Sequence, residues 1–406
     1  MSRATFFFIM LLILEWYSIQ AIRVWTRPFS PSWRTGIWVL YGLGSLMAYG
    51  YLLYNIFNEG PKPDWWRIYG MAGFVIWILS KVPIGGVMFL DDIRRVFSWG
   101  INQMTGEVKF DPGRSRFMAK AALALGALPF GVLTYGMARN GFRYRLHEQD
   151  VPIAGLPEEL NGLKIVQISD IHSGTWTDDA PVHKAVELIN EQAADLVCFT
   201  GDLVNSLASE MAPFVETFSQ IKAKYGVYSV MGNHDYGDYY NFNSPDGYDN
   251  NRQEFFETHR AMGWDLLMNE NRLIDVNGRK LAMIGVENWS ALRRFPRKGD
   301  LAAARIGTEE ADVRVLMSHD PTHWEAQVLD TDIDLTLSGH THGFQFGIEI
   351  PGFKWSPAKF MYKQWAGIYK QGQQWLYVNR GLGCLVYPGR VGILPEVTVL
   401  KLVNKA

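Results

Sequence analysis

The chain has 406 residues, of which 48% are hydrophobic and 20% are charged, so it is long enough for more than one domain. Its formal net charge of -2 provides no basic excess, so no nucleic-acid polymer is expected among its partners. Two cysteines are too few for a disulfide framework, and Cys198 and Cys384 are both expected to be free thiols.

The first 140 residues differ in kind from the rest of the chain. They contain apolar stretches of about 20 residues each, the length at which a helix crosses a bilayer. The sequence therefore predicts a multi-pass transmembrane region at residues 1–140, in contact with the lipid bilayer. Its helices are expected at residues 5–22, 35–57, 68–90 and 117–138.

Lys81 lies inside the third apolar stretch. A charge at that depth of a membrane has a functional role by default. The other interpretation is a lysine that extends toward the membrane surface or packs within the helix bundle. The residues alone leave both interpretations open.

Lysines and arginines in the short loops predict how the helices cross the membrane. The side that contains Arg23, Arg94 and Lys109 has eight such residues, and the side that contains Lys62 and Arg139 has six. Because cytoplasmic loops carry the excess, both ends of the chain are predicted to lie outside the cytoplasm. In a bacterium, the second domain would then face the periplasm.

Residues 141–162 are expected to be a linker, because Pro152, Gly155 and Pro157 interrupt any regular pattern there. Residues 163–406 are expected to form one further domain. The polar residues that could carry chemistry are concentrated in this domain.

Short β-branched runs in this domain each end just before residues of metal-ligand type. The runs are residues 164–169, 195–200, 225–230, 313–317 and 334–338. The residues that follow them are Asp170, His172, Asp202, Asn233, His234, His319, His340 and His342. Because strand ends of open α/β sheets form binding sites, we expect these side chains to converge at one sheet edge.

Carboxylate, amide oxygen and imidazole groups are ligands of divalent metal ions, at about four to six ligands per ion. The residues present are enough for two ions. Asp202 is the natural bridge, because paired metal ions usually share a carboxylate. Asp170 with His172, and His340 with His342, are expected to point the same way because alternate residues of a strand do so.

The segment after His342 is rich in aromatic side chains. Three of them, Phe353, Trp355 and Phe360, are candidates for contact with substrate. One interpretation is packing in the core. The other is an apolar wall beside the site that receives an acyl chain or rests on the membrane interface.

The motifs Asp-x-His, Gly-Asp, Gly-Asn-His-Asp, a lone His and Gly-His-x-His occur in this order along the chain. The set resembles the calcineurin-like metallophosphoesterase superfamily over roughly residues 150–402. The block Gly339–Gly343 and the tail Asn379–Gly383 followed by Pro395–Glu396 are similar to its membrane-associated bacterial branch. The resemblance implies an α/β domain, a four-layer α/β/β/α sandwich, after the four-helix transmembrane region.

The resemblance also implies a role for each candidate residue. One ion would be bound by Asp170, His172, Asp202 and His342. The other would be bound by Asp202, Asn233, His319 and His340. His234 would bind no metal and would be the catalytic acid or the electrostatic partner of the leaving oxygen. The two divalent ions would be Mn, Fe, Zn or Mg.

Two residues depart from the family pattern. Asn205 stands where relatives often have an acid or another polar residue, which leaves hydrogen-bonded support of the site open. Phe344 replaces a glycine, which could alter the backbone near the substrate. Neither departure removes a ligand.

These features predict a membrane-anchored phosphoesterase that hydrolyses a phosphate or pyrophosphate ester by in-line attack of a metal-bound hydroxide. A lipid-linked substrate is expected, because the anchor holds the site near the bilayer. One alternative is a phosphodiesterase for soluble nucleotides or glycerophosphodiesters. Another is a non-catalytic membrane scaffold or sensor, which would be expected to have lost ligands. The oligomeric state is left open.

Overall fold

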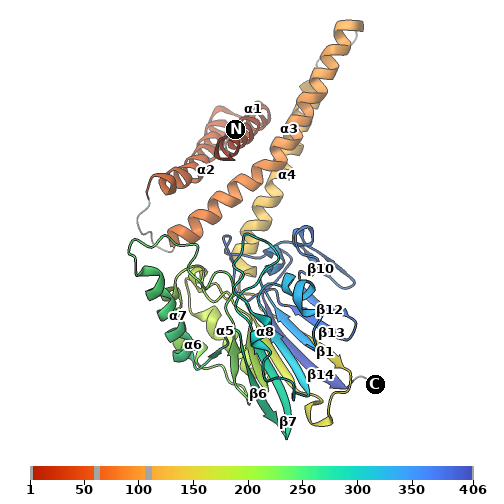
Figure 1. The fold of residues 1–406 in the computed structure, drawn as a ribbon. Coiled ribbons are helices and arrows are strands. Elements are labelled where there is room, and N and C mark those ends of the chain that lie inside the picture. The colour runs from red at the N-terminus through yellow and green to blue at the C-terminus, as the bar shows by residue number, and fades with distance from the viewer. Residues whose placement is uncertain (1–2, 59–64, 106–111, 405–406) are drawn as a thin grey trace. The chain divides into compact units, whose positions relative to one another are not determined.

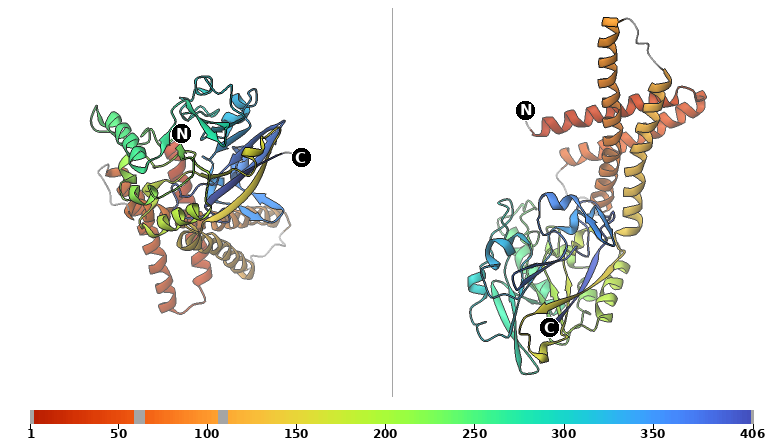
Figure 2. Two further views of the ribbon diagram at one scale, coloured as in Figure 1. Left: turned by 90° about the horizontal axis from the view of Figure 1, so that it is seen from below. Right: turned by 90° about the vertical axis from the view of Figure 1, so that its right-hand side faces the viewer.

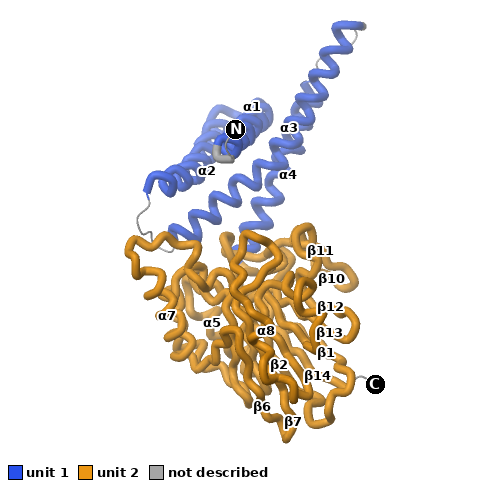
Figure 3. The backbone as a smooth tube through the Cα atoms, viewed as in Figure 1, with its two compact units in different colours: residues 1–138 blue, residues 139–406 orange. Residues whose placement is uncertain are grey.

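The computed structural model describes residues 3–58, 65–105 and 112–404. The chain divides into two compact units, Met1–Ala138 and Arg139–Ala406, which are coloured separately in Figure 3. Lys62 and Lys109, which entered the orientation argument, lie outside the described residues.

The first unit consists of long helices, seen as extended coils in Figure 1 and again from two other sides in Figure 2. They are α1 (Arg3–Thr26), α2 (Pro31–Phe57), α3 (Met71–Thr105) and α4 (Pro112–Tyr135). In the described part of the chain, four helical segments are long and apolar enough to cross a membrane. This confirms the expected four-helix region.

Helix α3 continues past residue 90, where the apolar stretch ends. Asp91 is buried, and its carboxylate pairs with Arg94 at 2.8 Å and Arg95 at 2.7 Å. Arg95 also donates a hydrogen bond to Ser115 of α4 at 3.0 Å. Because these charges are paired at helical spacing, they continue the helix that hydropathy alone would end.

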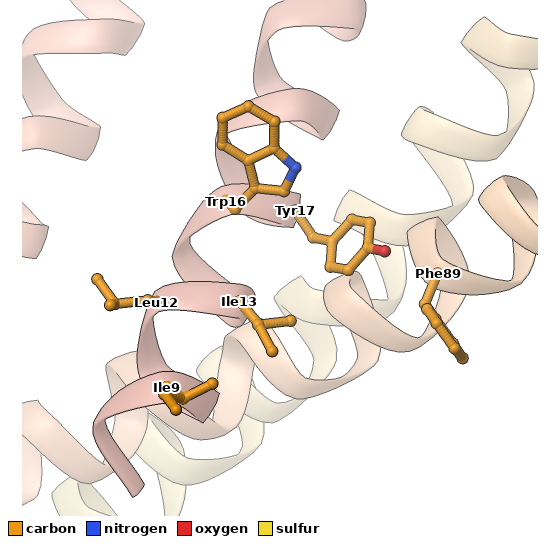
Figure 4. Close-up of a pocket in the computed structure, with 6 residues that line it drawn as sticks. All are labelled: Ile9, Leu12, Ile13, Trp16, Tyr17 and Phe89. Atoms are coloured by element: carbon orange, nitrogen blue, oxygen red, sulfur yellow. The ribbon is translucent and has the colours of Figure 1, made fainter. Parts of the chain in front are cut away.

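An apolar groove runs along α1 and α3 (Figure 4). Its lining side chains are aliphatic or aromatic, namely Ile9, Leu12, Ile13, Trp16, Tyr17 and Phe89. Leu12 is 70% exposed and Trp16 is 62% exposed. Large apolar side chains with this exposure are suited to contact with hydrocarbon chains and not with water.

Lys81 of α3 forms an ion pair with Glu15 of α1. Glu15 also accepts hydrogen bonds from the hydroxyls of Tyr41 at 2.7 Å, Ser45 at 2.9 Å and Tyr49 at 2.7 Å. The charge of Lys81 is therefore balanced inside the helix bundle. This arrangement favours the packing interpretation of Lys81 over that of an isolated functional charge.

Replacing Lys81 with methionine is expected to destabilise the first unit by about 3 to 5 kcal/mol, because Glu15 would keep a partly buried charge without its partner. The double variant with Glu15→Gln should recover most of that loss. The measurement is the melting temperature of the purified protein in detergent, with Lys120→Met on the exposed face of α4 as control. Equal losses in the single and double variants would show that the pairing does not matter.

Two six-stranded sheets form the second unit. In spatial order, the first contains β1 (Arg145–Ile153), β14 (Glu396–Asn404), β2 (Lys164–Ile168), β3 (Leu196–Phe199), β4 (Val227–Ser229) and β5 (Asp265–Leu266). The second contains β12 (Gly367–Gln371), β13 (Gln374–Val378), β9 (Leu335–Ser338), β8 (Val313–Met317), β7 (Arg279–Gly285) and β6 (Glu270–Val276). A separate hairpin consists of β10 (Ile348–Ile350) and β11 (Phe353–Trp355). The helices are α5 (Ala180–Glu191), α6 (Val215–Phe218), α7 (Gly247–Met262) and α8 (Leu301–Ala304).

Alternating side chains along the strands separate the hydrophobic cores of this unit. On β2, Ile165 packs in the core between the two sheets, whereas Val166 packs in the core shared with α5, α6 and α7. On β7, Leu281 belongs to the core between the sheets, and Ala282 packs with Trp324 on the other face. Helical segments thus cover the outer face of each sheet. This confirms the predicted four-layer α/β/β/α domain.

The segment at residues 141–162 is not simply a linker, because it contains β1. This strand pairs in parallel with β14 from Arg145 opposite Glu396 to Ile153 opposite Asn404. The two strands run side by side in both views of Figure 2. Because β1 is an edge strand, its polar residues and Pro152 are tolerated. Because most of its residues are polar, β1 lacks the run of apolar residues from which a strand is predicted.

Candidate metal centre

The predicted ligands follow the carboxyl ends of strands in both sheets. From the first sheet, Asp170 and His172 follow β2, Asp202 follows β3 and Asn233 follows β4. From the second sheet, His319 follows β8, and His340 and His342 follow β9. The expectation of a single sheet edge was therefore wrong. The site is formed where two packed sheets end together.

The ligand atoms form two groups. One contains Asp170, His172 and His342, and the other contains Asp202, His319 and His340. Within each group, the ligand atoms lie within 4.8 Å of one another. The Oδ2 atom of Asp202 lies 3.1 Å from Nε2 of His319 and 3.6 Å from Nε2 of His172, so this carboxylate reaches both groups.

This donor set fits two divalent cations. The Nε2 atoms of His172 and His342 are 3.0 Å apart, and Nδ1 of His340 is 3.2 Å from Nε2 of His319. Facing imidazole nitrogens share at most one proton, whereas a cation accepts a lone pair from each. The Oδ1 atom of Asn233 is buried and has no hydrogen-bond partner among the described residues. A buried unpaired amide oxygen is suited to metal coordination.

Left-handed backbone conformations orient the ligands. Asp170, His172, Asp202, His340 and His342 have φ angles between 48° and 69°. Such angles are uncommon for residues other than glycine, and they concentrate at functional sites. Asp170 with His172, and His340 with His342, were expected to point the same way because they alternate along an extended strand. That explanation was wrong, because their backbone is not extended. Turns beyond the strand ends direct these side chains.

Gly339, which precedes His340, leaves room for the side chain of the candidate ligand Asp170. A Cβ atom at Gly339 would lie 2.0 Å from Oγ of Ser169 and 2.3 Å from Oδ2 of Asp170. Without that atom, the backbone N–H of His340 donates to both carboxylate oxygens of Asp170 at 3.1 Å. The glycine thus lets the loops from the two sheets meet.

Asn205, whose contribution the sequence left open, supports two histidines. Its side-chain oxygen lies 3.0 Å from Nδ1 of His172, and its backbone oxygen lies 2.7 Å from Nδ1 of His234. In the same way, Nδ1 of His319 donates to the backbone oxygen of Thr200 at 2.7 Å. A hydrogen bond at Nδ1 fixes the ring and leaves Nε2 available as a ligand.

Asp235 holds two ligand loops together, a role that sequence analysis missed. Its buried carboxylate accepts hydrogen bonds from the backbone N–H groups of Asp202, Leu203 and Gly232, each at 2.8 Å. These bonds connect the loop that presents Asp202 to the loop that presents Asn233. The only signal in the sequence was its place as the last residue of the Gly-Asn-His-Asp motif.

The charges of Asp202 and His319 depend on each other. Burial opposes ionisation of Asp202, but the charges of His319 and His234 outweigh it and hold the pKa of this carboxyl well below its usual range. Burial would likewise lower the pKa of His319, but the Asp202 carboxylate raises that pKa to about 10. A proton on His319 and a divalent cation are therefore alternatives for balancing Asp202. Metal binding is expected to release that proton.

His234 stands beside the two groups and belongs to neither. It is half-buried, and its ring centroid lies 4.9 Å from that of His172 and 4.4 Å from that of Tyr239. Because Asn205 occupies Nδ1, only Nε2 of His234 remains for proton transfer. Tyr239 lies in the polar loop that follows the Gly-Asn-His-Asp motif at residues 232–235.

The three aromatic candidates do not lie together in a core. Phe353 is 52% exposed and Phe360 is 75% exposed, whereas Trp355 is partly buried. The core interpretation was therefore wrong for Phe353 and Phe360. At Phe344, the backbone keeps a left-handed φ of 53°, as a glycine would. Cys198 and Cys384 are buried free thiols, as expected.

Comparison with known proteins identifies both parts of the chain. Residues 1–141 match the family model described as "Probable Calcineurin-like phosphoesterase, transmembrane domain", and residues 163–344 match "Calcineurin-like phosphoesterase". The transmembrane protein with metallophosphoesterase domain of Danio rerio is 30% identical over 370 residues, covering 87% of this chain and 77% of the relative. The chain belongs to the calcineurin-like metallophosphoesterase family.

Two bacterial relatives match about two thirds of this chain and nearly the whole of their own length. The uncharacterized metallophosphoesterase YkuE of Bacillus subtilis is 27% identical, over 68% of this chain and 94% of its own. The phosphodiesterase YaeI of Escherichia coli is 28% identical, over 71% of this chain and 99% of its own. This metallophosphoesterase is thus a membrane protein whose family uses two divalent metal ions.

Proposed function

We propose that this metallophosphoesterase hydrolyses a phosphate or pyrophosphate ester of a lipid-linked substrate at the site centred on Asp202. The main support for this proposal is that one carboxylate reaches both ligand groups. Oδ2 of Asp202 lies 3.1 Å from Nε2 of His319 and 3.6 Å from Nε2 of His172. The excess of lysine and arginine in the loops on the opposite side of the membrane further favours a second unit that faces the periplasm.

Each side chain has a distinct part in this proposal. Divalent ions would lower the pKa of a bound water and neutralise charge on the phosphoryl oxygens. The seven proposed ligands would hold the two ions, and the ions would supply the positive charge that positions a phosphoryl group for in-line attack. His234 donates a proton from Nε2 to the leaving oxygen. Asp235 and Asn205 keep the ligand loops and rings in place.

The direct test is turnover of bis(p-nitrophenyl) phosphate and of a panel of lipid and nucleotide phosphate esters. The full-length protein is stripped of metal and then supplied with Mn, Fe, Zn or Mg. The proposal expects metal-dependent hydrolysis with two ions per chain. A protein that binds two ions but turns over none of the panel would be a scaffold or sensor instead.

An exposed apolar surface beside the site supports a lipid substrate. We call it the hairpin surface, and it consists of Ile348, Ile350, Phe353, Phe360 and Met361, which are 42% to 75% exposed. The hairpin is attached next to His342, because Oγ of Ser356 donates to the backbone oxygen of Gly343 at 2.6 Å. Exposed apolar side chains at such a position are suited to an acyl chain or the membrane interface.

Replacing Phe353, Trp355 and Phe360 with serine tests this part of the proposal. Each side chain that an acyl chain fully covers is worth about 1.5 to 3 kcal/mol of binding. The loss should appear in kcat/KM for a long-chain lipid phosphate and be absent for a short soluble ester. Phe353 and Phe360 can also be changed without Trp355, which avoids disturbing the one partly buried member.

The matched control is Ile306→Ser, since Ile306 is 74% exposed on a different loop. Metal content and melting temperature should be unchanged in every variant. Proportional loss on soluble and lipid substrates would mean that the hairpin supports the site itself and does not bind lipid. In that case, soluble nucleotides or glycerophosphodiesters become the favoured substrates.

A further inference from the structure

Two tyrosine hydroxyls contact side chains that are proposed as ligands of the same ion. The Tyr239 hydroxyl accepts a hydrogen bond from Nδ2 of Asn233 at 3.0 Å, and the Tyr362 hydroxyl lies 2.9 Å from Nε2 of His340. Asn233 and His340 are both assigned to the ion beside His319, which we call the second ion. The two hydroxyls are therefore placed to act on one ion of the pair.

The surroundings of His340 decide which of its ring nitrogens faces the second ion. Its Nδ1 atom lies 3.2 Å from Nε2 of His319, whereas its Nε2 atom lies 2.9 Å from the Tyr362 hydroxyl and 3.4 Å from Oδ2 of Asp320. The Asp320 carboxylate is buried, and Thr322 donates to its other oxygen at 2.7 and 2.8 Å, which fixes the direction of Oδ2. Because a carboxylate accepts hydrogen bonds and does not donate them, the proton of the neutral ring stays on Nε2. The lone pair of Nδ1 is then left for a cation.

The amide of Asn233 can also face the second ion in two ways, with its oxygen or with its NH₂ group. Only the oxygen offers a lone pair to a cation. Tyr239 accepts from the NH₂ group, and this leaves the buried Oδ1 atom, which has no hydrogen-bond partner among the described residues. The Tyr239 side chain is 50% exposed, but its ring centroid lies 4.4 Å from that of His234. Packing against His234 thus holds the hydroxyl beside the amide.

We propose that Tyr239 and Tyr362 are positioning residues that determine how tightly the second ion binds. Each hydroxyl contacts the atom that must point away from the cation, Nδ2 in Asn233 and Nε2 in His340. The ligands proposed for the other ion include neither of these side chains, so its affinity should not depend on the two hydroxyls. The inference rests on the proposed function, because it takes these side chains as metal ligands.

The test is a calorimetric titration of the metal-free, full-length protein with Mn²⁺. The wild type should bind two ions, and Tyr239→Phe should weaken one binding step about 10- to 100-fold, as expected when the support of a metal ligand is lost. Tyr362→Phe should weaken the same step by less, because Asp320 still faces Nε2 of the histidine. Tyr240→Phe is the matched control, because it removes a hydroxyl from the neighbouring tyrosine, which is 45% exposed.

Variants of the ligands identify which ion is affected. His172→Ala removes a ligand of the other ion, so the binding step that remains should still be weakened by Tyr239→Phe. His340→Ala removes a ligand of the second ion, so the step that remains should not respond to Tyr239→Phe. The reverse pattern would overturn the inference.

Asn233→Asp separates orientation of the amide from a general loss of structure. A carboxylate offers an oxygen to the ion whichever way it is turned, so Tyr239→Phe should weaken binding less than about twofold in that background. Losses of equal size in the Asn233 and Asp backgrounds would show that Tyr239 acts only on the structure of its loop, and would overturn the proposed role. The melting temperature of the metal-free Tyr239→Phe protein should match that of the wild type.

Failure of this inference and failure of the proposed function give different results. A wild type that binds two ions, together with unchanged binding in Tyr239→Phe, would overturn the positioning role alone. A wild type that binds fewer than two ions would contradict the proposed function, and the positioning role with it.

Discussion

Asp202→Asn is expected to lower turnover at least about a hundredfold, because even residues that only support metal ligands contribute about 10- to 100-fold. The carboxylate reaches both ligand groups through Oδ2, while Oδ1 accepts a hydrogen bond from the backbone N–H of His234 at 2.8 Å. An asparagine that keeps the bond to His234 would direct its NH₂ group toward the histidine ligands. It would then have neither the charge nor the lone pair to join two cations.

The measurement is kcat/KM on an aryl phosphodiester together with the metal content of the purified variant. Asp238→Asn, at an exposed position in the loop beside His234, controls for loss of a nearby negative charge. Near-normal turnover with two bound ions would exclude Asp202 as the shared ligand.

The second large effect is expected at His234. His234→Ala should lower turnover by about 10² to 10⁴, the usual range for a general acid, while metal content stays near that of the wild type. Its Nδ1 is bonded to the backbone of Asn205, and it lies outside both ligand groups. The loss should be smaller on substrates whose leaving group needs no proton, because the missing acid then matters less.

His340→Ala is the contrasting variant, since its Nδ1 faces Nε2 of His319 at 3.2 Å within the second ligand group. It should lose metal as well as turnover. If the His234 and His340 variants lose metal equally, His234 is a ligand and has another role than the one proposed.

The candidate ligands could be predicted because their signals are local. Each lies within four residues of the end of a β-branched run, so residue type and position along the chain were sufficient. Their supporting groups carried no such signal. Asn205 bonds to His172 from 33 positions away, and Asp235 bonds to Leu203 from 32 positions away. Nothing in either local pattern indicates which loop the side chain will meet.

By itself, the sequence determined the apolar membrane helices, the β-branched strands that precede the candidate ligands and the identity of those ligands. Hydrophobic periodicity and residue chemistry act over a few neighbouring positions, so they can be read along one chain. The tertiary structure decided which residues meet across the fold. It paired Lys81 with Glu15 at a separation of 66 residues, placed β1 beside β14 and brought ligands from two sheets together. These contacts depend on how distant elements pack and on left-handed turns beyond the strands, which leave no periodic pattern in the sequence.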